Sequence, residues 1–93
     1  MLNEEQVTSV EEKIDYRISV YSSYPNDVEI IAIVITQDKL DDEVLERISK
    51  YGKVVKTFPF LNTVKVKGSA KTLAKLANED FVRYIMLDEV LSQ

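Results

Sequence analysis

The chain has 93 residues, no Cys, no His and a formal charge of −4, a length that suits one domain with its own core. The absence of Cys excludes disulfides, a thiol nucleophile and Cys-ligated zinc or iron–sulfur centres. The absence of His removes the commonest general base, the Ser–His and Cys–His pairs and the usual imidazole metal ligand. We therefore expect a binding module that is not an enzyme and needs no cofactor or metal.

The first fifteen residues account for the whole net charge of −4. They carry five acids against the single base Lys13, and the acids are Glu4, Glu5, Glu11, Glu12 and Asp15. Such an acidic segment disfavours nucleic acid or an anionic membrane as its partner. The longest apolar run, residues 30–35, is far too short to span a bilayer. The first residues also lack the basic start and apolar stretch of a signal peptide.

Two strands are predicted in the first third of the chain. Residues 16–24 (YRISVYSSY) alternate well enough for a strand, and Pro25-Asn26-Asp27 supplies turn chemistry after it. Residues 28–36 (VEIIAIVIT) are rich in β-branched side chains and apolar on both faces. That pattern predicts a central strand covered on two sides.

The middle of the chain predicts a helix followed by two strands. Residues 41–51 carry an apolar stripe and acids in the first turn, and Gly52 is placed to cap their C-terminal end. Residues 53–60 (KVVKTFPF) form a second strand, in which Pro59 favours an edge position. Residues 63–67 (TVKVK) alternate as a third strand.

A second helix and a last strand complete the pattern. Ser69 is a favourable N-cap for a helix over 70–78, whose buried stripe is Leu73, Leu76 and Ala77. Residues 82–88 (VRYIMLD) form the fourth strand, and residues 89–93 follow as a short tail. The tail can fray or lie as an added strand in a groove on another protein.

From residue 28 the order strand–helix–strand–strand–helix–strand predicts an α+β, ferredoxin-like split βαββαβ sandwich. Its four-stranded antiparallel sheet has both helices on one face and the spatial order 4-1-3-2. We divide the chain into an N-terminal extension over 1–27 and an α+β domain over 28–93. A strand over 16–24 has no free side on the first strand, so it attaches elsewhere or is ordered by a partner.

Two helices can cover only one face of such a sheet. The pattern puts Ile31, Ile33 and Ile35 on one side of the first strand and Ile30, Ala32 and Val34 on the other, and it sets Val82, Tyr84 and Met86 opposite Ile85 and Leu87 on the fourth. Burial of one face under the helices therefore leaves apolar side chains on the other. An exposed apolar patch of this kind marks an interaction surface. A partner protein, the first 27 residues or a second copy of the chain can cover it.

Other chemical sites find little support in the sequence. The acids between Asp38 and Glu46 lack the spacing and central Gly of a calcium loop, and a helix N-terminus explains them. Residues 47–75 contain eight bases and no acids. RNA-recognition domains share this order of elements but stack bases on aromatic residues of the two central strands, which here have none. We therefore expect no nucleic-acid partner.

Residues 28–93 resemble the propeptide/inhibitor domain of subtilisin-like serine proteases. The resemblance rests on the first strand, on Tyr51-Gly52-Lys53-Val54, on Phe58-Pro59-Phe60-Leu61-Asn62 and on the ending "D-x-x-V-x-Y-V-x-x-D-x-V". The stretch in this chain that looks like that ending is Asn78-Glu79-Asp80-Phe81-Val82-Arg83-Tyr84-Ile85, followed by Asp88 and Val90. Met86 stands where the family often has a second carboxylate.

The resemblance implies an inhibitor and intramolecular chaperone of a subtilisin-like protease, monomeric when free. The open sheet face packs on two protease helices, Asp88 caps them, and the tail fills the substrate cleft with Val90, Leu91, Ser92 and Gln93. A free-standing inhibitor of this kind would be cytoplasmic, and one excised from a secreted precursor extracellular. The alternative is a small dimeric ferredoxin-like regulatory domain that binds a ligand between subunits.

Overall fold

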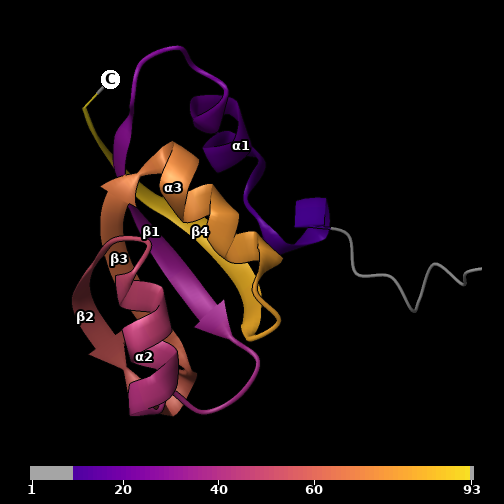
Figure 1. Ribbon diagram of the computed structural model, residues 1–93, viewed down its shortest axis with the longest axis vertical. Coiled ribbons are helices and arrows are strands. Elements are labelled where there is room, and N and C mark those ends of the chain that lie inside the picture. The colour runs from indigo at the N-terminus through magenta and orange to yellow at the C-terminus, as the bar shows by residue number, and fades with distance from the viewer. Residues whose placement is uncertain (1–9, 93) are drawn as a thin grey trace, which may run out of the picture.

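A four-stranded antiparallel sheet in the order β2-β3-β1-β4 forms one layer of the protein, and helices form the other (Figure 1). The computed structural model describes residues 10–92. The strands are β1 (Glu29–Thr36), β2 (Lys53–Phe58), β3 (Thr63–Ser69) and β4 (Val82–Ser92). The α-helices are α1 (Tyr16–Ser22), α2 (Asp42–Ser49) and α3 (Ala70–Ala74), and the 3-10 turns are η2 (Val10–Lys13), η3 (Pro59–Leu61) and η4 (Lys75–Asn78). The predicted α+β class and strand order are confirmed, and the sheet is compatible with a ferredoxin-like split βαββαβ fold.

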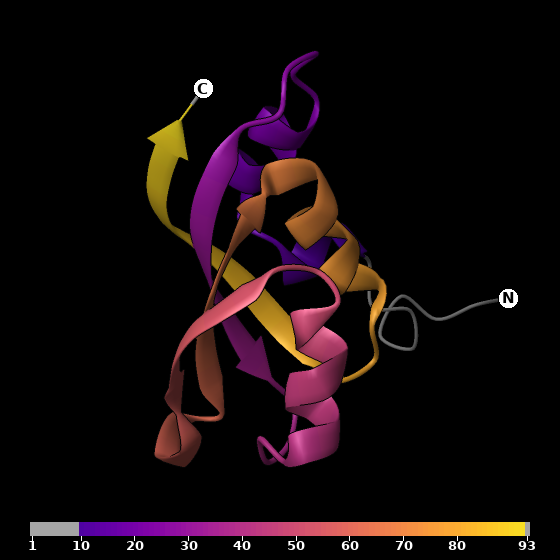
Figure 2. The same cartoon turned by 60° about the vertical axis from the view of Figure 1, so that its left-hand side comes forward.

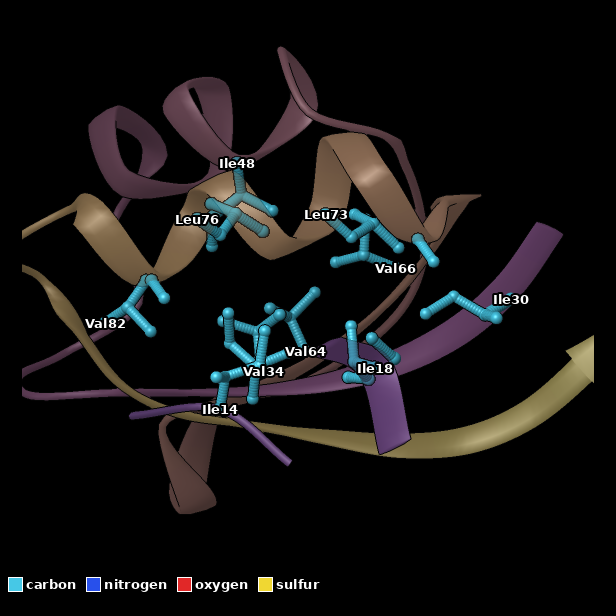
Figure 3. Packing of buried hydrophobic residues seen from close by; sticks show 14 of the residues in the cluster. Ile14, Ile18, Ile30, Val34, Ile48, Val64, Val66, Leu73, Leu76 and Val82 are labelled. Carbon is cyan, nitrogen blue, oxygen red and sulfur yellow. The ribbon is translucent and has the colours of Figure 1, made fainter. Parts of the chain in front are cut away.

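The central strand β1 organises the core. It pairs with β3 on one side and β4 on the other, so every second side chain meets the helices. Ile30, Ala32 and Val34 point to that side and are fully buried. Figure 3 shows helix side chains that pack towards the sheet, among them Ile48 of α2, Leu73 of α3 and Leu76 of η4. Burial of each such side chain contributes about 1.5–3 kcal/mol.

The predicted edge strand 53–60 is shorter than expected. β2 is an edge strand, as predicted, but it ends at Phe58, and Pro59 begins the turn η3. Pro suits the first position of such a turn because its ring already fixes φ near the required value. There, the N–H that it lacks is not needed for a sheet hydrogen bond. Asn62 then adopts a left-handed conformation with φ 49° and leads into β3, a conformation that Asn tolerates better than most residues.

The two predicted helix caps, Gly52 after α2 and Ser69 before α3, do not act as caps of the predicted kind. Asp41 caps α2 by accepting a hydrogen bond from the Val44 amide (2.9 Å), whereas Gly52 has no positive φ and forms no left-handed cap. Gly52 is instead required by close packing, because a Cβ there would lie 2.6 Å from the Lys67 carbonyl oxygen. Ser69 occupies the N-cap position of α3, but its hydroxyl makes no cap hydrogen bond.

The expected strand over 16–24 is wrong, because Tyr16–Ser22 is the helix α1. Ile18 and Tyr21 lie one turn apart on α1 and pack on the core. Asp15 accepts a hydrogen bond from the Arg17 amide and so caps the helix. Both sides of β1 are taken by β3 and β4, and a helix satisfies its own backbone hydrogen bonds.

The described part of the N-terminal segment is fastened to the edge of β4 that faces away from β1. The Asp15 amide donates to the Ile85 carbonyl (2.8 Å), and the Leu87 amide donates to Asp15 Oδ2 (3.1 Å). Lys13 Nζ donates to the Glu79 carbonyl (2.8 Å). α1 packs chiefly against α3, so this segment extends the helix layer and shares the core of residues 28–92.

Candidate interaction surface on the open face of the sheet

The side of the sheet away from the helices is here named the open face. Figure 2 shows the helices gathered on the opposite side. The strand register sets Ile33 between Lys65 on β3 and Met86 on β4, and residues paired in this way share one face. By the same register the open face comprises Ile31, Ile33, Ile35, Lys53, Lys56, Phe58, Thr63, Lys65, Lys67, Tyr84, Met86 and Glu89.

The half of the open face formed by β1 and β4 is apolar. Ile31, Ile33 and Ile35 form a stripe along β1, as the sequence predicts, and they are partly buried by the longer side chains beside them. Tyr84 and Met86 extend the stripe on β4, and Met86 is 39% exposed. A contiguous stripe of this kind is the feature that marks a docking surface.

Val82 was expected on this face and lies on the other. β1 pairs Thr36 with Val82 but Ile35 with Tyr84, so Arg83 is an extra residue on β4. One extra residue reverses which face the side chains before it occupy. Val82 is therefore fully buried against the helices.

The half of the open face formed by β2 and β3 is basic. Lys53 pairs with Lys67, and Lys56 pairs with Lys65. In a regular strand residues 53 and 56 would face opposite ways, but the register shift between Val54 and Lys56 places an extra residue between them. Alternation in the sequence places Lys65 and Lys67 on one face of β3. The extra residue in β2, which adds Lys53 and Lys56 to the same face, leaves no mark in the local sequence, so the full cluster was not predicted.

Asp88 lies at the junction of the two halves. Its Oδ2 is 3.2 Å from Lys65 Nζ, although Asp88 is on β4 and Lys65 on β3 with β1 between them. The ion pair therefore crosses over the apolar stripe of β1. Both side chains remain about one-third exposed, at 32% for Asp88 and 34% for Lys65, so the pair is accessible and contributes little to stability.

The predicted tail residues belong to β4. We expected this strand to end at Asp88, but it continues to Ser92, which pairs with Glu29, and Val90 pairs with Ile30. Val90 packs on the core, which explains why the strand continues, and Leu91 is the extra residue of an irregular step and is 37% exposed. The structure brings Asp88, Val90, Leu91 and Ser92 together on one strand end, and Gln93 lies outside the described residues.

Residues 10–92 contain neither a cluster of metal-ligating side chains nor a membrane-spanning helix. In this range no three acidic side chains come close enough to hold a metal ion together. None of the helices in this range is long and apolar enough to cross a membrane.

Comparisons of the chain with protein families, with characterised proteins and with solved structures give no match to any of them. The open face and the end of β4 are therefore the features from which a function can be argued.

Proposed function

We propose that the protein inhibits a subtilisin-like serine protease and assists its folding, in the manner of the propeptide/inhibitor domains that the sequence resembles. The observation that carries the proposal is the apolar stripe of Ile31, Ile33 and Ile35 on the open face. The described part of the N-terminal segment packs on α3 and the β4 edge. Residues 10–27 therefore leave the stripe uncovered.

In this proposal two surface helices of the protease pack on the apolar stripe. Asp88 releases Lys65 and accepts hydrogen bonds from unsatisfied amides at the N-terminus of a protease helix, where a negative charge is favourable. The exchange is inexpensive because the ion pair with Lys65 is partly exposed. Asp88 is therefore the residue whose charge links the open face to the cleft.

The C-terminal residues then occupy the substrate cleft in extended form. Val90, Leu91 and Ser92 are already extended as part of β4, which lowers the ordering cost on binding. Entry into the cleft opens the last pairs with Glu29 and Ile30, at a net cost of about 0.5–1.5 kcal/mol for each hydrogen bond lost. It also withdraws the partly buried Val90 from the core, which adds to this cost. Occupation of the cleft inhibits the protease, and binding of the folded protease surface favours its folding.

The test is titration of a subtilisin-type protease with the purified chain while a small chromogenic peptide is hydrolysed. We expect stoichiometric loss of activity. Removal of residues 90–93 should abolish inhibition and leave the circular-dichroism spectrum near that of the full chain. Asp88→Asn should weaken inhibition, while Asp80→Asn, an exposed acid before β4, should not. An intact chain that leaves the protease fully active would refute the proposal.

The same apolar stripe also favours a second candidate, a dimeric regulatory domain in which two copies cover it and bind a ligand between them. Light scattering distinguishes the two functions, because the inhibitor should be a monomer of 10.7 kDa and the regulatory domain twice that mass. A stable dimer would favour the regulatory domain over the inhibitor.

A further inference from the structure

The basic half of the open face places like charges directly opposite one another. Lys53 faces Lys67 and Lys56 faces Lys65 across the β2–β3 ladder. Like charges at directly opposed positions destabilise a sheet. These pairs occur in a chain whose net charge is −4, so they are a local concentration of positive charge on an acidic protein.

Little in the described part of the chain neutralises this cluster. Asp88 pairs with Lys65 at 3.2 Å, and no ion pair joins the other three lysines to any residue between 10 and 92. Lys56 Nζ lies 5.2 Å from the centre of the Phe58 ring, which holds the ammonium over an aromatic on the same face. The cluster therefore presents cations beside an apolar stripe.

We propose that the open face binds a protein that presents an amphipathic helix with an acidic flank. The apolar side of that helix packs on Ile31, Ile33 and Ile35, and its carboxylates lie over the lysines of β2 and β3. Charge complementarity of this kind fixes the orientation of a partner and speeds its encounter. This inference rests on the proposed function only in that both use the open face. What it adds is that the partner is acidic beside its apolar side.

The charges on the face distinguish this occupant from two others. A second copy brings Asp88 and Glu89 against four lysines, which leaves cations buried without partners, at considerable cost. A single-stranded nucleic acid supplies phosphates but stacks its bases on aromatic side chains, and the aromatic residues of the open face, Phe58 and Tyr84, lie on the separate edge strands β2 and β4. The residues next to the lysines on β1 are isoleucines, which suit the aliphatic side of a protein helix.

The experiment uses two synthetic helical peptides with the same leucine face, one flanked by glutamates and the other by lysines. Each is titrated into the labelled protein while backbone amide shifts are followed by NMR. We expect the glutamate peptide to bind at least about ten-fold tighter. Its shifts should centre on β1 and β3, and its affinity should fall as salt is added. The double substitution Lys53→Glu and Lys56→Glu should reverse the preference.

Lys75→Glu is the matched control, since Lys75 is exposed on η4 in the helix layer, and it should leave the preference unchanged. Equal binding of both peptides, shifts confined to the helix layer, or tighter binding of a thymidine oligonucleotide would each overturn the inference. A dimer that buries the open face would do the same.

The protease titration separates this inference from the proposed function. If the chain inhibits a protease but shows no charge preference, the partner inference fails and the function stands. If the glutamate peptide is preferred and no protease is inhibited, the partner inference stands and the proposed inhibition of a protease fails.

Discussion

Replacement of Asp15 by asparagine tests how the N-terminal segment is fastened to the sheet. Asp15 Oδ1 accepts from the Arg17 amide (2.9 Å) and Nε (3.2 Å), and Oδ2 accepts from Arg17 Nη2 (2.8 Å) and the Leu87 amide (3.1 Å). One carboxylate therefore caps α1, pairs with Arg17 and bonds the outer edge of β4. Asparagine keeps the shape and an oxygen acceptor for the cap but loses the charge.

The magnitude follows from the pKa of Asp15. This pKa is lowered from 3.8 to about 2, chiefly by the side-chain hydrogen bonds from Arg17; burial opposes the shift, and the backbone amides of Arg17 and Leu87 add to it. A shift of this size corresponds to roughly 2 kcal/mol of folding free energy. Because the Arg17 side chain is 64% exposed, solvent screening reduces the expected loss in Asp15→Asn to about 1–2 kcal/mol.

The assay is urea unfolding of the wild type and Asp15→Asn between pH 7 and pH 2. A lowered pKa in the folded state stabilises the protein above the unfolded pKa of 3.8, and this stabilisation is lost as the pH falls towards about 2. The two proteins should therefore differ fully at pH 7 and converge at the acid end. Asp15→Ala should lose about 1 kcal/mol more at pH 7, because the cap is also lost.

Equal stability of wild type and Asp15→Asn at pH 7 would refute this account of Asp15. A difference that persists undiminished at pH 2 would also refute it, because the charge would then not be its source.

Three further substitutions test the packing and the charges, each measured by urea unfolding. Gly52→Ala should destabilise the protein by about 1–3 kcal/mol, since its Cβ would lie 2.6 Å from the backbone oxygen of Lys67; a neutral result would mean that this approach is looser. Ser69→Ala should be neutral or stabilising because its hydroxyl is buried without a hydrogen-bond partner among the described residues; a loss of about 1 kcal/mol would indicate a working cap. Lys53→Glu with Lys56→Glu should stabilise the free protein by about 0.4–2 kcal/mol, as two repulsive pairs become attractive. That gain should shrink with added salt, and a salt-independent gain would contradict its electrostatic origin.

The sequence by itself determined the elements whose local pattern and burial agree. Residues 28–36 are apolar on both faces, a pattern that fits a central strand with helices on one side and an apolar open face on the other. β1 is that strand. Leu73, Leu76 and Ala77 were predicted to be the buried side of their helical segment, and all three are buried. Alternation separated Ile31, Ile33 and Ile35 from Ile30, Ala32 and Val34, and the packing of the helices decided that the first set lies on the open face.

The tertiary structure alone decided three other features. The aromatic and β-branched residues of 16–22 favour a strand by propensity, but the filled sides of β1 and the contacts of Ile14 and Ile18 with the core make the segment a helix. Single extra residues in β2 and β4 reversed the faces of neighbouring side chains, and such irregularities depend on pairing between distant strands. Val90 continued β4 because Ile30 offered it a place beside the core. Local pattern therefore identified which segments carry apolar side chains, and long-range pairing decided which of those side chains are buried and where each strand begins, bends and ends.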